Sequence, residues 1–206
     1  MGKKKLNKEL IVAGLFTLVL IISAFYDFFY KDGEKIFRIV LNFITVAGVY
    51  LLYIKSFLKG CKIIYYINMV FVFLSMYLAS IIGFYSIDNY DKFLHILSGS
   101  VIAIIGYILF LYLTNEKSRS EMHPLTAAIF VALFATAAAG AWEIWEFTTD
   151  SLFGLSAQNG SLTDTMWDII SGTAVGIVTS IPIYLHSKGI NIKIIDKIFE
   201  DIEKNN

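Results

Sequence analysis

Long apolar stretches, each broken by only a few polar residues, recur along the whole chain. A transmembrane helix needs roughly 20 mostly apolar residues to cross about 30 Å of hydrocarbon. Six stretches of this kind are present, and no stretch of comparable length is left over. They cover residues 10–26, 36–54, 63–84, 93–113, 124–147 and 163–185. The pattern predicts an all-α, polytopic membrane protein with six transmembrane helices.

The composition agrees with this pattern. Apolar residues make up 57% of the chain and charged residues 17%, and only two prolines are present. This apolar share is higher, and the charged share lower, than in a soluble domain. We therefore expect a single transmembrane domain over residues 1–185.

Residues 186–206 form a tail of a different kind. Its apolar residues recur at helical spacing, with lysines and glutamates on the rest of the helical wheel. These apolar residues are Ile194, Ile195, Ile198, Phe199 and Ile202. We expect a cytoplasmic amphipathic helix that lies on the membrane or on the protein's own loops. Docking of a partner is the alternative.

The basic residues predict the orientation, because cytoplasmic loops carry an excess of lysine and arginine. Of the 17 basic residues, 13 lie in the N-terminal segment, the loops 55–62 and 114–123, and the tail. Both termini are therefore expected to be cytoplasmic, and the cell (inner) membrane is the expected location. The formal net charge of zero indicates no nucleic-acid partner.

Ionisable residues gather at the outer ends of three expected spans. They form pairs whose members are three or four residues apart and so share one helix face. The pairs are Asp91/His95 on the fourth span, Glu143/Glu146 on the fifth and Asp164/Asp168 on the sixth. Glu143 and Asp168 should lie roughly 6 Å below the helix ends, inside the apolar slab.

Charged groups at this depth normally face a protein interior or a watery cavity. If the three pairs converge, their mutual repulsion must be relieved by a cation, by protonation or by a cationic ligand. Histidine nitrogen and carboxylate oxygen suit zinc, manganese or iron, so a divalent metal is the cofactor we consider, although the sequence does not establish one. The expected metal ligands are His95, Glu143, Glu146, Asp164 and Asp168. Of these, Glu143 and Asp168 are also the catalytic candidates.

Simpler roles are open for several of these residues. Asp91 and Asp164 stand where a carboxylate can cap a helix N-terminus. Glu146 can be solvated, and His95 can be an ordinary hydrogen-bonded histidine. The supporting residues of the site are Asp91, Lys92, Trp142, Trp167 and Gly172.

Small residues favour close packing of the same three spans. They lie at 98–100, 135–141 and 172–176. We therefore expect a tight bundle of the fourth, fifth and sixth spans, with the first three as a scaffold. The outer segment 148–162 is either a lid over the site or a plain loop.

At these motifs the sequence resembles the YjdF-like family of bacterial and archaeal inner-membrane proteins, which has no assigned reaction. The matching elements are Tyr90-Asp91-Lys92-x-x-His95-x-x-Ser98-Gly99, Glu143-x-x-Glu146 and Asp164-Thr165-x-Trp167-Asp168-x-x-x-Gly172. A fainter similarity is to VanZ-like proteins, which are associated with glycopeptide resistance. Glu146 and Asp168 here replace a glutamine and an asparagine of that pattern, which makes the site more acidic and favours a cation.

Three functions follow as hypotheses. The first is a metal-dependent enzyme that acts on a lipid or lipid-linked headgroup at the outer leaflet. The second is a non-catalytic envelope or partner-binding protein. The third is an ion-coupled carrier, although the ionisable pairs all lie on one side of the expected bilayer and no inverted repeat is evident. Membrane lipid is the expected partner, and the sequence does not indicate an oligomeric state.

Overall fold

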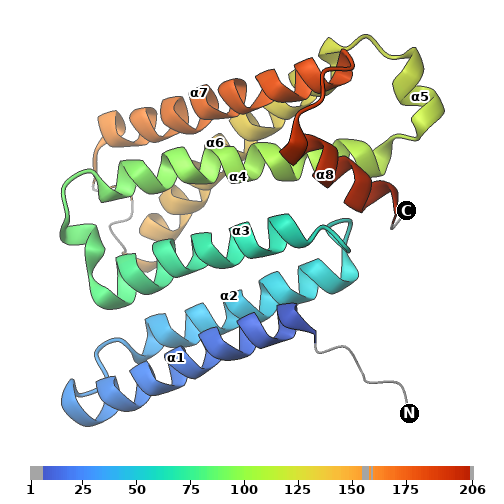
Figure 1. Cartoon of the computed structure of the whole chain (residues 1–206). Helices are drawn as coiled ribbons and strands as arrows, with labels where there is room; N and C mark the ends of the chain where they lie inside the picture. The colour runs from blue at the N-terminus through green and yellow to red at the C-terminus, as the bar shows by residue number, and fades with distance from the viewer. Residues whose placement is uncertain (1–6, 155–157, 159, 205–206) are drawn as a thin grey trace, which may run out of the picture. The chain divides into compact units, whose positions relative to one another are not determined.

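The computed structural model describes residues 7–154, 158 and 160–204, and the regular structure within them is entirely helical. Within these described residues, six helices are long and apolar enough to cross a membrane. The expected all-α, multi-pass fold is thereby confirmed (Figure 1). The side of the membrane on which the termini lie stays a prediction.

The chain divides into two compact units between Tyr90 and Asp91. The first unit contains α1 (Lys8–Tyr30), α2 (Ile36–Lys55), α3 (Lys62–Val72), the π-helix η1 (Phe73–Ile82) and the 3₁₀ turn η2 (Phe84–Ser86). The π-helix follows α3 directly, so the two together form the third span, 62–82. This span was expected over 63–84.

Polar contacts hold both ends of the first unit together. The buried Glu9 carboxylate lies 3.3 Å from the ammonium group of Lys62. The Tyr65 hydroxyl donates to the Glu9 carbonyl at 2.7 Å. At the other end, the Lys35 backbone N–H donates to the buried Asp27 carboxylate at 2.8 Å. These buried acids therefore have partners within their own unit.

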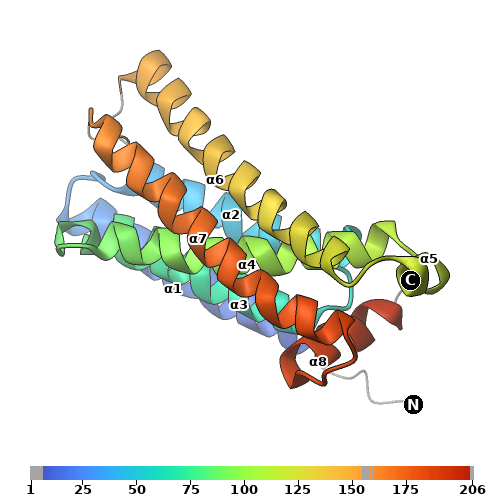
Figure 2. The ribbon, with the colours of Figure 1, turned by 90° about the horizontal axis from the view of Figure 1, so that it is seen from above.

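The second unit contains four longer helices and one short one. They are α4 (Tyr90–Leu113), which starts at the last residue of the first unit, α5 (Glu116–Glu121), α6 (Leu125–Phe153), α7 (Leu162–Ser187) and α8 (Lys193–Glu203). In both views α7 runs beside α4 and α6 (Figures 1 and 2). The fifth span was expected to end at residue 147, but α6 continues to Phe153.

Glycines bring α4, α6 and α7 into close contact. A methyl group on Gly99 of α4 would lie 2.8 Å from the carbonyl oxygen of Gly172 on α7. A methyl group on Gly172 would lie 3.1 Å from the Ala139 side chain on α6. Only glycine allows so near a backbone approach at the first contact. The tight bundle expected from the small residues is confirmed.

Helix α8 buries its apolar face against the second unit. Ile195, Ile198 and Ile202 are at most 3% exposed. Asp196 pairs with His186 of α7, with 3.2 Å between Oδ1 and Nε2, and Glu203 pairs with Arg119 of α5. The tail is thus an amphipathic helix, as expected, and its apolar face is covered by the protein itself.

Candidate metal centre

Three of the expected site residues come together near the start of α4 and the first turns of α7. Asp91 and His95 lie four residues apart on one face of α4, with 3.8 Å between Oδ1 and Nε2. His95 Nε2 also lies 3.7 Å from Oδ2 of Asp168 on α7. One ligand atom from each of the three residues lies within 4.8 Å of the others. Ligands about 2.0–2.2 Å from a single ion are about 3.3 Å apart, so the side chains would have to close by roughly 0.5–1.5 Å around it.

Asp168 is the most buried member of this group. The residue is 4% exposed, and its Oδ1 atom has no hydrogen-bond partner among the described residues. A buried carboxylate without a full set of partners is costly in free energy. Asp91 and His95 are only partly buried, and the charges of Asp91, Asp164 and Glu143 lie within electrostatic range of Asp168. A bound cation would relieve both the missing partner and the repulsion.

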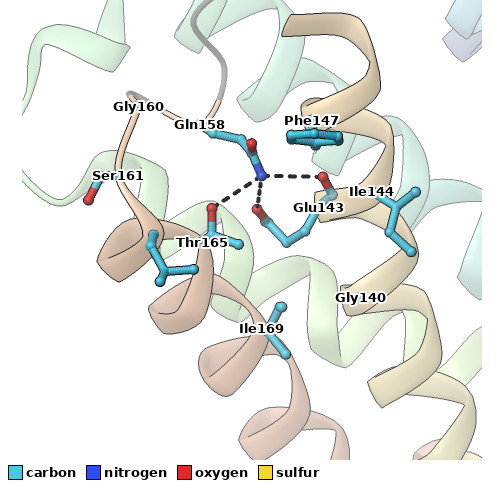
Figure 3. Close-up of a pocket in the computed structure, with 10 residues that line it drawn as sticks. Gly140, Glu143, Ile144, Phe147, Gln158, Gly160, Ser161, Thr165 and Ile169 are labelled. Carbon is cyan, nitrogen blue, oxygen red and sulfur yellow. Dashed lines mark hydrogen bonds between the residues drawn. The ribbon is translucent and has the colours of Figure 1, made fainter. Parts of the chain in front are cut away.

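Glu143 is the second buried carboxylate of the site, and it lies apart from the three clustered ligand atoms. It is 5% exposed, and Oε1 has no hydrogen-bond partner among the described residues. The side-chain amide nitrogen of Gln158 is 3.5 Å from Glu143 Oε2, 3.4 Å from the Glu143 carbonyl and 3.2 Å from the Thr165 hydroxyl (Figure 3). Glu143 therefore lies at a junction between α6, α7 and residue 158.

This junction lines a cavity of about 600 Å³. The lining residues are Gly140, Glu143, Ile144, Phe147, Gln158, Gly160, Ser161, Leu162, Thr165 and Ile169 (Figure 3). None of them is a lysine, arginine or histidine. The pocket combines one carboxylate with neutral polar groups and apolar side chains.

The other expected ligands lie at the edge of the cluster. The Glu146 carboxylate accepts a hydrogen bond of 2.8 Å from the Trp142 indole, and it is within electrostatic range of Glu143 and His95. Asp164 lies in the first turn of α7, where the Ser161 side chain caps the helix by accepting from the Asp164 N–H at 3.2 Å. The N-cap is therefore Ser161, and Asp164 is not the capping residue. Neither acid belongs to the group of ligand atoms that lie within 4.8 Å of one another.

The supporting residues take separate places. Lys92 is exposed and lies within electrostatic range of Asp91. Trp142 and Trp167 are both more than half exposed, as expected for side chains that face lipid or the interface. Gly172 provides the contact between α4 and α7 described above.

A comparison with protein families decides which family this chain belongs to. A family model described as "Predicted membrane protein (DUF2238)" matches residues 8–189. The chain belongs to the DUF2238 family. No curated protein and no solved structure matches this DUF2238 protein.

The family match covers all six spans and every residue of the site in the DUF2238 protein. Its description names a membrane protein and no reaction.

The structure adds two residues that the sequence did not single out as site residues. Gln158 was noted only as part of the segment 148–162, and Thr165 only as part of a motif. Polar residues next to Glu143 in space, but distant in the chain, cannot be recognised from helical spacing. Residues 155–157 and 159 lie outside the described residues, so the question of a lid or a plain loop falls partly outside them as well.

Proposed function

We propose that this membrane protein binds a divalent cation through Asp91, His95 and Asp168. The observation that supports this most directly is the grouping of their ligand atoms within 4.8 Å, with Asp168 buried and Oδ1 unpartnered among the described residues. Two carboxylates and one neutral imidazole carry a charge of about −2, which matches a divalent ion. Zinc, manganese and iron suit this mixture of oxygen and nitrogen ligands.

We further propose that the bound ion serves catalysis on a lipid or lipid-linked headgroup. Catalytic zinc sites commonly have three protein ligands and one open position for water or substrate. Glu143 supports this reading, because it is a buried carboxylate with one oxygen unpartnered among the described residues and lies within electrostatic range of Asp168, and such a group can act as a general base. The side of the membrane on which this occurs follows from the expected orientation, which places the site at the outer face.

A structural ion is the second candidate. The proposed ligands come from two helices, α4 and α7, so an ion would tie these helices together without any reaction. The ion-coupled carrier gains no observation of its own from the structure. The likeness to VanZ-like proteins stays an expectation from the motifs and contributes no substrate to the proposal.

Metal binding can be tested on the full chain purified in detergent. The protein is stripped with a chelator, reloaded separately with Zn²⁺, Mn²⁺ and Fe²⁺, desalted and analysed for its metal content. We expect about one ion per chain in the wild type and a large loss in His95→Gln and Asp168→Asn. The matched control is His123→Gln, because His123 is an exposed histidine outside the cluster. Equal metal content in wild type and both site variants would overturn the proposal.

A further inference from the structure

The cavity lined by α6, α7 and Gln158 contains a buried carboxylate that does not belong to the three clustered ligands of the proposed metal centre. Its one ionisable lining residue, Glu143, is 5% exposed and has an oxygen without a partner among the described residues. The nearby polar groups do not provide a hydrogen bond to this oxygen. The Gln158 amide approaches only the other oxygen, Oε2, and does so at 3.5 Å. Among the described residues, the pocket therefore supplies no hydrogen-bond donor to Glu143 Oε1.

The charges around the pocket indicate which charge a donor to Glu143 Oε1 should carry. None of the described lining residues is basic, and Asp168 and Glu146 are both within electrostatic range of Glu143. The one charged side chain among the described lining residues is the Glu143 carboxylate, which would repel an anionic group. A positively charged donor would instead form a charge-assisted hydrogen bond with Glu143.

The apolar wall of the pocket indicates what such a donor is attached to. Ile144, Phe147 and Leu162 line the cavity, and all three are largely exposed in a helix pair that spans the membrane. Exposed apolar side chains on and at the ends of membrane-spanning helices face hydrocarbon or the membrane interface. An aromatic ring such as that of Phe147 can also attract a cation. A ligand that enters from the lipid thus meets apolar side chains first and the carboxylate further in.

We propose that this pocket binds the primary ammonium headgroup of a membrane lipid, with the ammonium nitrogen on Glu143 and the chains along Ile144, Phe147 and Leu162. The inference deepens the proposed function, because such a lipid would be its substrate. The claim that this lipid is a substrate rests on that proposed function. The binding itself requires no metal.

Gly140 provides a way to fill the pocket without changing its charge. It lines the cavity, and a methyl group added to it would have nothing within 4 Å. A leucine at this position has space for its first carbon and projects into the cavity. Gly140→Leu should therefore exclude the lipid while leaving Asp91, His95 and Asp168 unchanged.

The test uses the purified full chain in detergent, mixed with equal amounts of phosphatidylethanolamine and phosphatidylcholine that carry identical chains. Native mass spectrometry counts each lipid retained on the protein. Phosphatidylcholine is the matched probe because its quaternary ammonium keeps the charge and lacks N–H donors. We expect phosphatidylethanolamine to be retained about tenfold or more over phosphatidylcholine, the size of effect typical of a charged hydrogen bond.

The variants locate the preference. Glu143→Gln and Gly140→Leu should each bring the ratio close to one, while the control Glu121→Gln, in the short helix α5, should keep the wild-type ratio. Glu143→Gln removes the charge of the pocket and Gly140→Leu fills its volume. If one variant fails to fold, the other still tests the inference. A wild-type ratio near one, or a preference that persists in both pocket variants, would overturn the inference.

Metal content measured on the same samples separates the two proposals. Normal metal content without a lipid preference removes the lipid inference and leaves the metal centre intact. A lipid preference in a protein that binds no metal supports this inference and removes the proposed function. Phosphatidylglycerol serves as a third probe, and its enrichment over phosphatidylethanolamine would also contradict a site built for an ammonium group.

Discussion

His95 and Asp168 connect two neighbouring helices at one point, with His95 Nε2 3.7 Å from Asp168 Oδ2. His95 is on α4 and Asp168 is on α7, and the contact is made possible by the glycines that bring these helices together. An imidazole held between two carboxylates, one of them buried, is an arrangement that a divalent cation would complete.

Ion binding should stabilise the protein. An ion that binds only the folded state at 100 times its Kd adds about 2.7 kcal/mol. We expect Zn²⁺ or Mn²⁺ to raise the thermal unfolding midpoint of the wild type in detergent. The same ion should produce little shift in Asp168→Asn, whereas the remote variant His123→Gln should respond like the wild type. An equal shift in all three proteins would place the stabilising ion elsewhere.

The contact between α4 and α7 should be sensitive to a single methyl group. In Gly99→Ala the new carbon would lie 2.8 Å from the Gly172 carbonyl oxygen, so a backbone must move. Overpacking of this kind costs about 1–3 kcal/mol, and it should also weaken metal binding because the ligands come from these two helices. Gly140→Ala is the matched control, since nothing lies within 4 Å of its added carbon. Thermal unfolding and metal titration of the two variants measure the difference, and equal behaviour would contradict the close approach.

The buried polar side chain of Asn42 should lower the stability of the first unit. The residue is completely buried in α2, and neither Oδ1 nor Nδ2 has a hydrogen-bond partner among the described residues. Replacement by leucine removes unpaired polar atoms that cost about 1–3 kcal/mol. We expect Asn42→Leu to raise the thermal unfolding midpoint. Arg38→Leu tests the opposite case, because the Arg38 side chain donates to the Ser80 carbonyl, and this variant should not gain stability. A loss of stability in Asn42→Leu would show that the amide has a partner such as water.

The packing of α8 should depend on one face of the helix only. Ile198 is fully buried, whereas Ile194 on the same helix is 45% exposed. Truncation of a buried isoleucine costs about 2–5 kcal/mol. In Ile198→Ala we expect faster hydrogen exchange and proteolysis over residues 193–203, with Ile194→Ala close to the wild type. If both variants exchange alike, the apolar face of α8 is not held by the protein.

The spans could be predicted because apolar length alone reports them, but their ends could not. Residues 148–153 are largely polar, so the hydropathy pattern stops before the helix does. In the structure α6 continues through these residues, and the hydroxyls of Thr148 and Thr149 donate to the carbonyls of Ile144 and Trp145 within the helix. Side chains that satisfy the helix backbone in this way leave no apolar signal. The π-helix after α3 likewise follows from backbone geometry that periodicity does not encode.

The candidate site was predictable within each helix and much less so between helices. The pairing of Asp91 with His95 follows from their spacing of four residues. The meeting of His95 with Asp168 depends on how α4 and α7 pack, which the small residues suggested only in outline. Glu146 was expected beside Glu143 and lies within electrostatic range of it, while its carboxylate accepts from Trp142, which is four residues away on the same face. Gln158 reaches Glu143 from outside both helices, where spacing gives no information.

X-ray absorption at the zinc edge of the reloaded protein reports the atoms around the ion and so tests the proposed metal centre itself. We predict oxygen and nitrogen neighbours at about 2.0–2.2 Å, with the outer-shell scattering of one imidazole. That imidazole signal should disappear in His95→Gln and persist in His123→Gln. A wild-type spectrum without an imidazole, or one that His95→Gln leaves unchanged, would contradict the metal centre.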